Sequence, residues 1–280
     1  MPELPEVETM VLGLRKDLLG RTLSGVRIFD KSVLRNTPAR LLGKMRGARV
    51  ISLKRKGKFL VFRLSNGAAL LFHLKMTGRL LLRESGLPKG RWERLQMEFD
   101  GWKKSVFFVD PRRFGYLAVD AGGRECPVPL LYELGPDALA VSRQELEDIL
   151  AASRRPVKAL LLDQRSIAGL GNIYVDESLH RAGIHPAAPA LSATPEQAAA
   201  LYRAMRNILR KAVECGGSSV RNYRDSRGSA GSFQRLHRVY GKQGEKCRRC
   251  GSEIEYAKIA SRGTHFCPAC QKKPAGRKQR

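Results

Sequence analysis

The stretch that decides the fold of this chain is CRRCGSEIEYAKIASRGTHFCPAC, residues 247–270. Two Cys-x2-Cys pairs, Cys247 with Cys250 and Cys267 with Cys270, lie sixteen residues apart in it. Two close thiolate pairs brought together by a hairpin supply the four ligands of a tetrahedral zinc site. Structural disulfides are the alternative, but they need an oxidising compartment, and no secretory signal is recognisable. The spacing therefore predicts one structural Zn²⁺ with no open position for chemistry.

Outward from the cysteines, the residues between the two pairs read as two short strands joined around Ala260–Gly263. Residues 239–272 are therefore expected to form a zinc finger. The last nine residues, KKPAGRKQR, hold five basic side chains, and residues 273–280 are expected to form a disordered basic tail.

The charge of the whole chain points to a polyanionic partner. The 280 residues include 52 Lys and Arg against 26 Asp and Glu, a net charge of +26. Nucleic acid is the default partner for such a surplus. An anionic membrane surface is the competing interpretation, but the chain has no apolar run of transmembrane length and no lipidation motif. The basic residues are spread along the chain, which favours a folded surface that faces phosphates.

The N-terminal part has the pattern of a β-sandwich or barrel preceded by one helix. Apolar residues recur at helical spacing in MPELPEVETMVLGLRKDLLG, and Gly20 is a natural helix end. Short apolar runs such as KFLVFRL and SVFFVD follow, and Asn66-Gly67 and Asp100-Gly101 are typical of hairpin turns. Residues 1–128 are expected to form a β-sandwich domain with an N-terminal helix, within an α+β fold.

The pattern becomes helical after a linker expected around Cys126–Pro129. The helical segments are RQELEDILAAS, PVKALLLDQ, NIYVDESLHRAG and TPEQAAALYRAMRNILRKAVECGG. Residues 135–231 are expected to form a helical domain. Its last part, the polar segment 216–231, is either a connector or a mobile binding element, and its length favours binding.

The first six residues bring an unusual amine close to two acids. Removal of Met1 would leave Pro2 with a secondary α-amine, whose reference pKa near 8 is well below that of lysine. Attack of such an amine on a sugar C1′ gives a permanently charged iminium, and Glu3 and Glu6 could move the protons that later steps require. The alternative interpretation is that Pro2 is an ordinary terminal residue and that the acids only cap the helix.

Several short motifs occur in a fixed order along the chain. They are MPELPEVET at residues 1–9, GKFL at 57–60, HLKMTG at 73–78, DPRRFG at 110–115, GLGNIYVDE at 169–177 and VYGKQGEKC at 239–247. This set closely resembles the bacterial formamidopyrimidine-DNA glycosylase family, enzymes that excise oxidised purines and cleave the abasic strand. The resemblance runs from residue 1 to 272, and Leu-Pro after Glu3 favours this branch over the related endonuclease VIII branch.

The resemblance implies roles for individual residues. Pro2 would be the nucleophile that forms a Schiff base, Glu3 the catalytic acid and base, Glu6 a supporting carboxylate, and Lys58 a lysine near the phosphates of the attacked nucleotide. Without the family, Lys58 reads as a solvated strand lysine. The implied DNA-binding residues are His73 and Arg113 on phosphates, Met76, Arg112 and Phe114 as the wedge that fills the gap of the extruded nucleotide, Asn172 and Tyr174 of a helix-two-turns-helix motif, Lys158 as a lysine near the site, and Arg262 at the hairpin tip.

The sequence thus predicts a bifunctional glycosylase and abasic-site lyase for 8-oxoguanine and ring-opened purines. We expect a cytoplasmic, nucleoid-associated monomer whose partner is double-stranded DNA with oxidised bases or abasic sites. The alternatives are an oxidised-pyrimidine glycosylase of the same fold and a non-catalytic zinc-ribbon protein. The resemblance also implies that the segment 216–231 closes over the everted lesion. Lys75 departs from it, because many relatives carry glycine there.

Overall fold

The computed structural model describes residues 1–38, 40–121, 131–220 and 223–273. The chain forms two compact units, Met1–Glu133 with Val213–Gln234, and Leu134–Ala212 with Arg235–Arg280. The expected linker at Cys126–Pro129 and the tail from residue 274 onward lie outside the described residues. The segment 216–231, expected to belong with the helices, groups with the first unit.

The first unit begins with helix α1, Leu4–Leu18. Pro5 suits the first turn because its missing N–H would have no helical partner there. The carboxylate of Glu6 accepts the backbone N–H of Glu3 at 2.8 Å. The apolar stripe of the helix is fully buried and consists of Val7, Met10, Val11, Leu14 and Leu18. Gly20, at φ +82°, follows the helix end as predicted.

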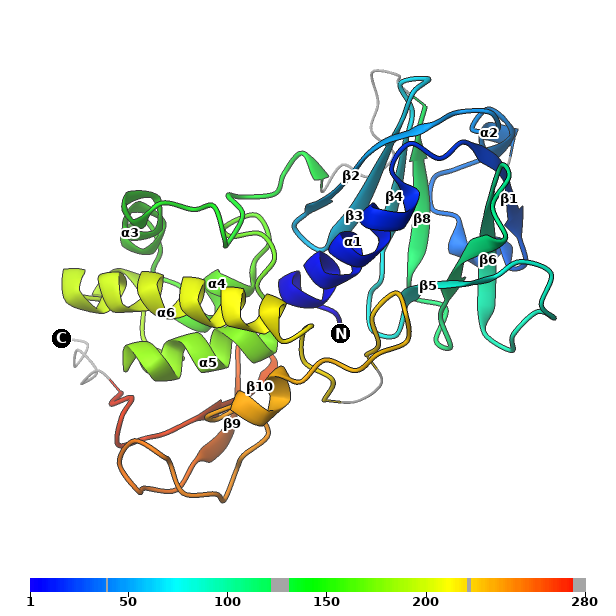
Figure 1. The fold of residues 1–280 in the computed structure, drawn as a ribbon. Coiled ribbons are helices and arrows are strands. Elements are labelled where there is room, and N and C mark those ends of the chain that lie inside the picture. The colour runs from blue at the N-terminus through cyan, green and yellow to red at the C-terminus, as the bar shows by residue number, and fades with distance from the viewer. Residues whose placement is uncertain (39, 122–130, 221–222, 274–280) are drawn as a thin grey trace. The chain divides into compact units, whose positions relative to one another are not determined.

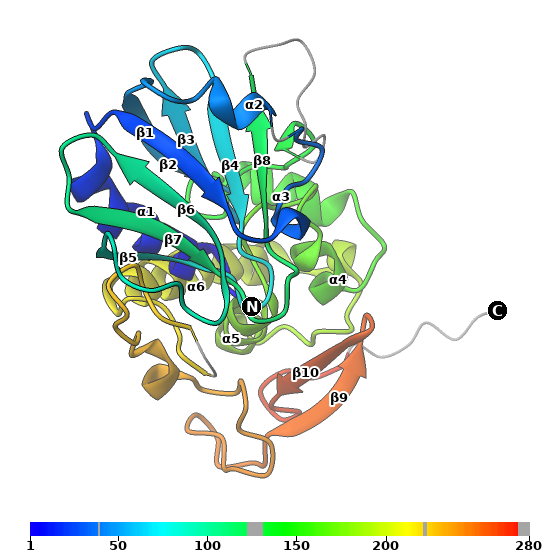
Figure 2. The same ribbon diagram turned by 90° about the vertical axis from the view of Figure 1, so that its right-hand side faces the viewer.

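Two antiparallel four-stranded sheets enclose the core of this unit (Figures 1 and 2). One sheet has the order β1-β6-β7-β5 and contains Leu23–Ile28, Glu93–Phe99, Lys104–Val109 and Arg79–Glu84. The other has the order β2-β3-β4-β8 and contains Val50–Lys56, Phe59–Leu64, Ala69–His73 and Tyr116–Asp120. Helix α1 contributes its apolar stripe to the same core. Short helices, η1 at Lys31–Val33 and α2 at Arg40–Gly43, lie between β1 and β2. The predicted β-sandwich with an N-terminal helix is confirmed.

The turns of the sandwich place the functional motifs. The Asn66–Gly67 and Asp100–Gly101 turns connect β3 to β4 and β6 to β7, as predicted, and both glycines have positive φ. Strand β5 pairs with β7 so that Arg79 lies opposite Val109. The β4–β5 turn, with HLKMTG, and the β7–β8 turn, with DPRRFG, therefore lie at the same end of that strand pair.

The second unit is helical and carries a small hairpin (Figure 1). Its helices are α3 at Arg143–Ala151, α4 at Val157–Leu162, α5 at Asn172–Ala182, η3 at Ala190–Ser192 and α6 at Pro195–Glu214, which continues into the first unit at Val213. The first unit ends at Gln234 within η4, Phe233–Leu236. Among the residues described, no helix has both the length and the apolar content needed to cross a bilayer.

The hairpin consists of β9, Glu255–Ile259, and β10, Arg262–Phe266 (Figure 2). Its turn is tighter than the expected Ala260–Gly263, because Arg262 already pairs with Ile259. Only Ala260 and Ser261 remain in the turn, and both have positive φ, the conformation of a two-residue type I′ connection. Arg262 therefore lies on the strand directly after the turn.

Candidate active site and nucleic-acid interface

The start of α1 holds two buried carboxylates, Glu3 and Glu6, that follow Pro2 closely in the sequence. Glu3 is 3% exposed, Glu6 is 1% exposed, and Pro2 is buried, whereas Met1 is 55% exposed. One oxygen of Glu6 accepts the N–H of Glu3, and the other accepts the N–H of Ser218 at 2.7 Å. Glu6 thus has a defined orientation, and the nearest carboxylates to Pro2 in sequence are held away from bulk water.

Glu6 also anchors the segment 216–231. The hydroxyl of Tyr223 donates to the backbone oxygen of Glu6 at 3.0 Å. Burial, together with the negative charges of Glu6 and Asp225, raises the pKa of Tyr223 well above its usual value, so the phenol keeps its proton. Gly217 has a φ of +84°, and a Cβ added at this position would lie 2.9 Å from the Glu6 side chain. These contacts have no local signal in the sequence, because more than 200 residues separate the partners.

Lys58 and His73 lie at neighbouring strand ends. Lys58 precedes β3 and is 7% exposed, and His73 ends β4, paired with Phe59. The N–H of Lys75 donates to Nδ1 of His73 at 3.0 Å, so the imidazole proton sits on Nε2. Burial, and then the charges of Lys75, Lys58 and Arg35, lower the pKa of His73 to about 3. His73 is therefore a neutral hydrogen-bond donor at physiological pH, suited to a phosphate oxygen.

The three predicted wedge residues come together on the two adjacent turns. Met76 is 41% exposed and Phe114 is 50% exposed. Nη1 of Arg112 lies 3.3 Å from Sδ of Met76, and its guanidinium carbon lies 4.7 Å from the centre of the Phe114 ring. An exposed thioether, a planar cation and an exposed ring form one contiguous group, although no apolar core demands it. Such a group can stack against unpaired bases.

Asp110 holds this group in place and was not predicted from the sequence. Its carboxylate is fully buried and accepts the hydroxyl of Thr77, the N–H of Arg112 and, at 2.7 Å, the N–H of Gly115. A Cβ at Gly115 would lie 2.6 Å from the Phe108 ring, so only glycine fits. The available signal was the position of this aspartate at the start of DPRRFG, as the first residue of a turn. Asp110 couples the turn that carries Met76 to the turn that carries Arg112.

Arg113 differs from its neighbours. Its Nε lies 3.2 Å from the carboxylate of Asp30, and its φ is +59°. The side chain is 63% exposed, so it remains a predicted phosphate contact that an acid already orients.

In the second unit, Lys158 and Asn172 converge on the hairpin. Nδ2 of Asn172 donates to the backbone oxygen of Gly263 at 2.8 Å, and Nζ of Lys158 donates to the same oxygen at 3.1 Å. Lys158 is fully buried and pairs with Asp176 at 2.6 Å, and Asp176 also accepts the N–H of His265 at 3.0 Å. The ammonium of Lys158, a predicted DNA contact, thus lies in the interior between α4, α5 and β10.

The remaining predicted contacts of this unit differ in exposure. Arg262 is exposed directly after the hairpin turn, where a phosphate can reach it. Tyr174 of α5 has a fully buried side chain, and its contact with DNA stays a prediction. Glu177 accepts three consecutive backbone N–H groups, of Arg238, Val239 and Tyr240, and so fixes the chain where it enters the zinc finger.

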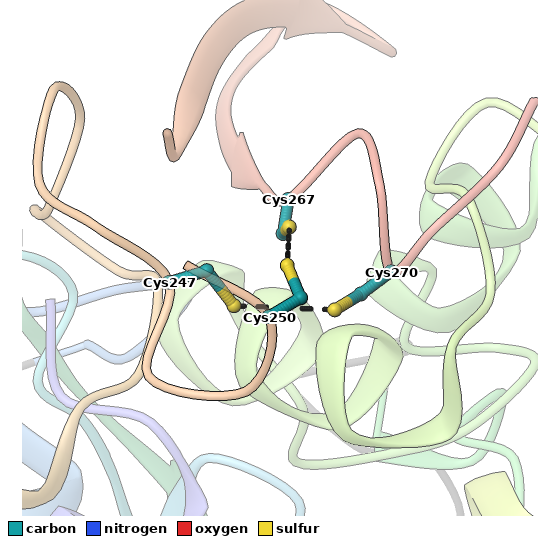
Figure 3. A group of neighbouring side chains, drawn as sticks. All are labelled: Cys247, Cys250, Cys267 and Cys270. Atoms are coloured by element: carbon teal, nitrogen blue, oxygen red, sulfur yellow. Dashed lines mark hydrogen bonds between the residues drawn. The ribbon is translucent and has the colours of Figure 1, made fainter. Parts of the chain in front are cut away.

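The four cysteines bring their sulfur atoms together (Figure 3). All four Sγ atoms lie within 4.8 Å of one another, with Cys250 and Cys267 at 3.4 Å and Cys247 and Cys270 at 4.0 Å. A tetrahedron of Zn–S bonds of about 2.3 Å requires S···S distances of about 3.8 Å. The donor set and its size fit one structural zinc ion. His180, whose pKa burial lowers to about 4, places Nε2 3.4 Å from Cys247 Sγ and can support that thiolate.

Comparisons with known proteins agree with this geometry. Family models match in chain order: the formamidopyrimidine-DNA glycosylase N-terminal domain over residues 1–117, its H2TH domain over 134–224, and a zinc finger found in FPG and IleRS over 244–273. A formamidopyrimidine-DNA glycosylase of Thermus thermophilus is 45% identical over 275 residues, which cover 97% of this chain and 98% of the relative. The chain belongs to the formamidopyrimidine-DNA glycosylase family.

Other members of the formamidopyrimidine-DNA glycosylase family show the same agreement. The Gluconobacter oxydans enzyme is 42% identical over 97% of this chain and 100% of its own length. The crystal structure of the Thermus thermophilus MutM (Fpg) protein matches with a TM-score of 0.86 at 44% identity, over 98% of this chain and all of that one. The Lactococcus lactis Fpg, solved in complex with DNA that contains an abasic site, matches with a TM-score of 0.89 at 35% identity, over 97% and 100%.

Proposed function

We propose that this protein removes oxidised purines, 8-oxoguanine and formamidopyrimidines, from double-stranded DNA and then cleaves the abasic strand. The observation that carries the proposal is the full-length match to the family, which includes a Lactococcus lactis Fpg variant solved with DNA that contains Fapy-dG. The buried Glu3 and Glu6 beside Pro2, and the exposed group Met76–Arg112–Phe114 in the same unit, supply the chemistry and the base extrusion that such an activity needs.

The covalent step belongs to Pro2. After removal of the exposed Met1, the secondary amine of Pro2 attacks C1′ of the damaged nucleotide, the bond from C1′ to the base breaks, and the base leaves with a proton. The amine loses its own proton, and cleavage of the C1′–O4′ bond opens the sugar ring, protonates O4′ and gives the iminium. Glu3, next to the nucleophile and shielded from solvent, moves the protons that ring opening and the later eliminations require. Loss of the 3′ and then the 5′ phosphate by β,δ-elimination cuts the strand and leaves a one-nucleotide gap.

Other residues grip the duplex. Lys58, His73 and Arg113 bind phosphates of the damaged strand from the first unit, and Asn172 and Arg262 bind them from the second. Lys158 and Tyr174, both fully buried, support this grip from the interior. The domain division that we propose follows these tasks: residues 1–128 for catalysis, 135–231 for DNA binding and lesion covering, 239–272 for the zinc finger, and 273–280 as a basic tail.

The segment 216–231 covers the everted base. Its anchoring to Glu6 through Ser218 and Tyr223 supports this role, because Glu6 lies in the first turn of α1, four residues after the proposed nucleophile Pro2. We further propose that the protein acts as a monomer in the cytoplasm and associates with the nucleoid through DNA binding. The oxidised-pyrimidine alternative is separated by parallel excision assays on 8-oxoguanine and thymine glycol duplexes of equal sequence.

The decisive test is the state of the Pro2 nitrogen. A variant that retains Met1 keeps this nitrogen in a tertiary amide, which has no usable lone pair. It should bind a duplex with an abasic-site analogue as well as the mature protein does, yet form no borohydride-trapped adduct with 8-oxoguanine DNA. Mass spectrometry of the tryptic N-terminus establishes which form is present. Normal trapping by the Met1-retaining form would move the nucleophile to another amine, with Lys58 as the next candidate.

A further inference from the structure

Lys75 occupies a position that costs the folded state in three ways. Its φ of +51° lies in the left-handed region, which residues other than glycine rarely adopt. Its side chain is half-buried, and burial together with the nearby charge of Arg35 lowers its pKa. A lysine with an unfavourable backbone, a partly dehydrated ammonium and a cationic neighbour is not there to stabilise the fold.

Arg35 is held beside the same spot. Its backbone N–H donates to Leu117 of β8 at 2.9 Å, and the Thr37 hydroxyl joins its carbonyl to the N–H of Val119. The guanidinium lies 4.9 Å from the centre of the Tyr116 ring, and Nζ of Lys75 lies 5.8 Å from that centre. The fold therefore fixes the segment of Arg35 to the sheet and gathers two cations about one aromatic ring.

In the part of the chain that the structure describes, this arrangement lacks the counter-ion that would make it a structural ion pair. Among the described residues, neither Lys75 nor Arg35 has a carboxylate within salt-bridge distance. His73 stacks on Tyr116 with centroids 5.6 Å apart and is a neutral donor. Two cations and a neutral N–H donor without an acid form a receptor for an anion.

We propose that Lys75 and Arg35 form a further phosphodiester subsite of the DNA interface, beside His73 and across the Tyr116 ring. The proposal rests on the function proposed above. It deepens that function by adding two phosphate contacts that the motifs did not indicate. The ligand chemistry is a backbone phosphate, because Met76, the next residue, belongs to the group that enters the duplex. The DNA affinity that the subsite contributes offsets the stability that Lys75 removes from the folded state.

The test compares folding with binding in the full-length, zinc-loaded protein. Lys75→Gly relieves the left-handed backbone and the repulsion from Arg35, so the midpoint of thermal unfolding should rise by roughly 2 °C. The same variant should lose one phosphate contact with a duplex that carries a tetrahydrofuran abasic-site analogue. The magnitude of the negative slope of log affinity against log salt should decrease by about 0.9, and affinity at 0.15 M salt should fall roughly five-fold. Arg35→Gln should reduce the slope similarly.

The controls separate charge from backbone. Lys75→Asn tolerates positive φ without the charge and should bind like Lys75→Gly, whereas Lys75→Arg should keep the wild-type slope. Lys103→Gly removes an exposed cation at the opposite end of β7 and should leave the slope unchanged. Unchanged slopes for Lys75→Asn or for Arg35→Gln would overturn the subsite. Excision of 8-oxoguanine by the wild-type protein is measured in parallel. If the wild type excises the base but the slopes do not change, the subsite is wrong and the proposed function stands; if it does not excise the base, the proposed function is wrong.

Discussion

Five residues other than glycine adopt positive φ among those that the structure describes: Asn36, Lys75, Arg113, Ala260 and Ser261. Four of them lie directly beside a residue that we propose to contact DNA, and Ala260 shares the hairpin turn with Ser261. Asn36 follows Arg35, Lys75 precedes Met76, and Ser261 precedes Arg262. Backbone of this kind persists only where surrounding contacts hold it, as Asp110 holds the turn of Arg113. The motifs identified Met76, Arg112 and Phe114 but not Arg35, and the positive-φ positions themselves could not be predicted, since no glycine marks them.

His73 makes the free energy of unfolding depend on pH. Its folded pKa is about 3, and its unfolded pKa is about 6.5, so the unfolded chain binds a proton that the folded chain refuses between these values. The contribution of His73 to the free energy of unfolding is fully present above pH 6.5. As the pH is lowered from 6.5 toward 3, this contribution decreases by roughly 1.4 kcal/mol per pH unit. Urea unfolding of wild type and His73→Gln at pH 8, 6 and 5 checks this. The difference at pH 8 reports the packing and hydrogen bonding of the side chain without any protonation. The variant should show the shallower decline, and equal declines would contradict the assignment.

Among the elements, the zinc hairpin has two attachments. At its base the four cysteines converge, and near its turn the Gly263 carbonyl accepts bonds from Lys158 and Asn172. Cys250→Ser removes one ligand of the first attachment. We expect it to lose stoichiometric zinc, to loosen β9 and β10, and to weaken DNA binding by at least ten-fold, with the first unit still folded. Metal analysis and amide exchange of the hairpin measure this, and the trapping of DNA at saturating concentration serves as control. Undiminished affinity without zinc would show that the hairpin does not contact DNA.

The elements themselves were largely predictable, because each has a local signal. Helical periodicity located α1, α3, α5 and α6, and Asn-Gly and Asp-Gly located two hairpin turns. Contacts between distant elements have no such signal. In the sequence, Lys158 looks like any other basic residue. The structure shows that its ammonium forms a buried ion pair with Asp176, which also accepts the N–H of His265 in β10. Likewise, the attachment of the segment 216–231 to Glu6 depends on three-dimensional proximity alone.

For the whole molecule, the net charge of +26 predicts that affinity for any duplex depends strongly on salt. Six phosphate contacts would give a slope of log affinity against log salt of about −5. Arg262→Ala should lower the magnitude of this slope by about 0.9 for damaged and undamaged DNA alike, because a phosphate contact carries no information about the base. Fluorescence anisotropy across 50–300 mM salt with both duplexes measures it. An affinity that ignores salt would contradict the phosphate interface, and a loss confined to damaged DNA would mean that Arg262 reads the lesion.

The segment Val213–Gln234 belongs to the first unit, although the ribosome synthesises it long after Met1–Glu133. Ser218 and its carboxylate partner Glu6 are 212 residues apart, so the ribosome delivers one long after the other. At about 5–20 residues per second, the N-terminal helix waits roughly 10–40 s before its acid receives that partner. The N-terminus of a nascent chain, which carries the proposed nucleophile Pro2, therefore stays in an unfinished state for this time, and we expect competence for strand cleavage only when synthesis is nearly over.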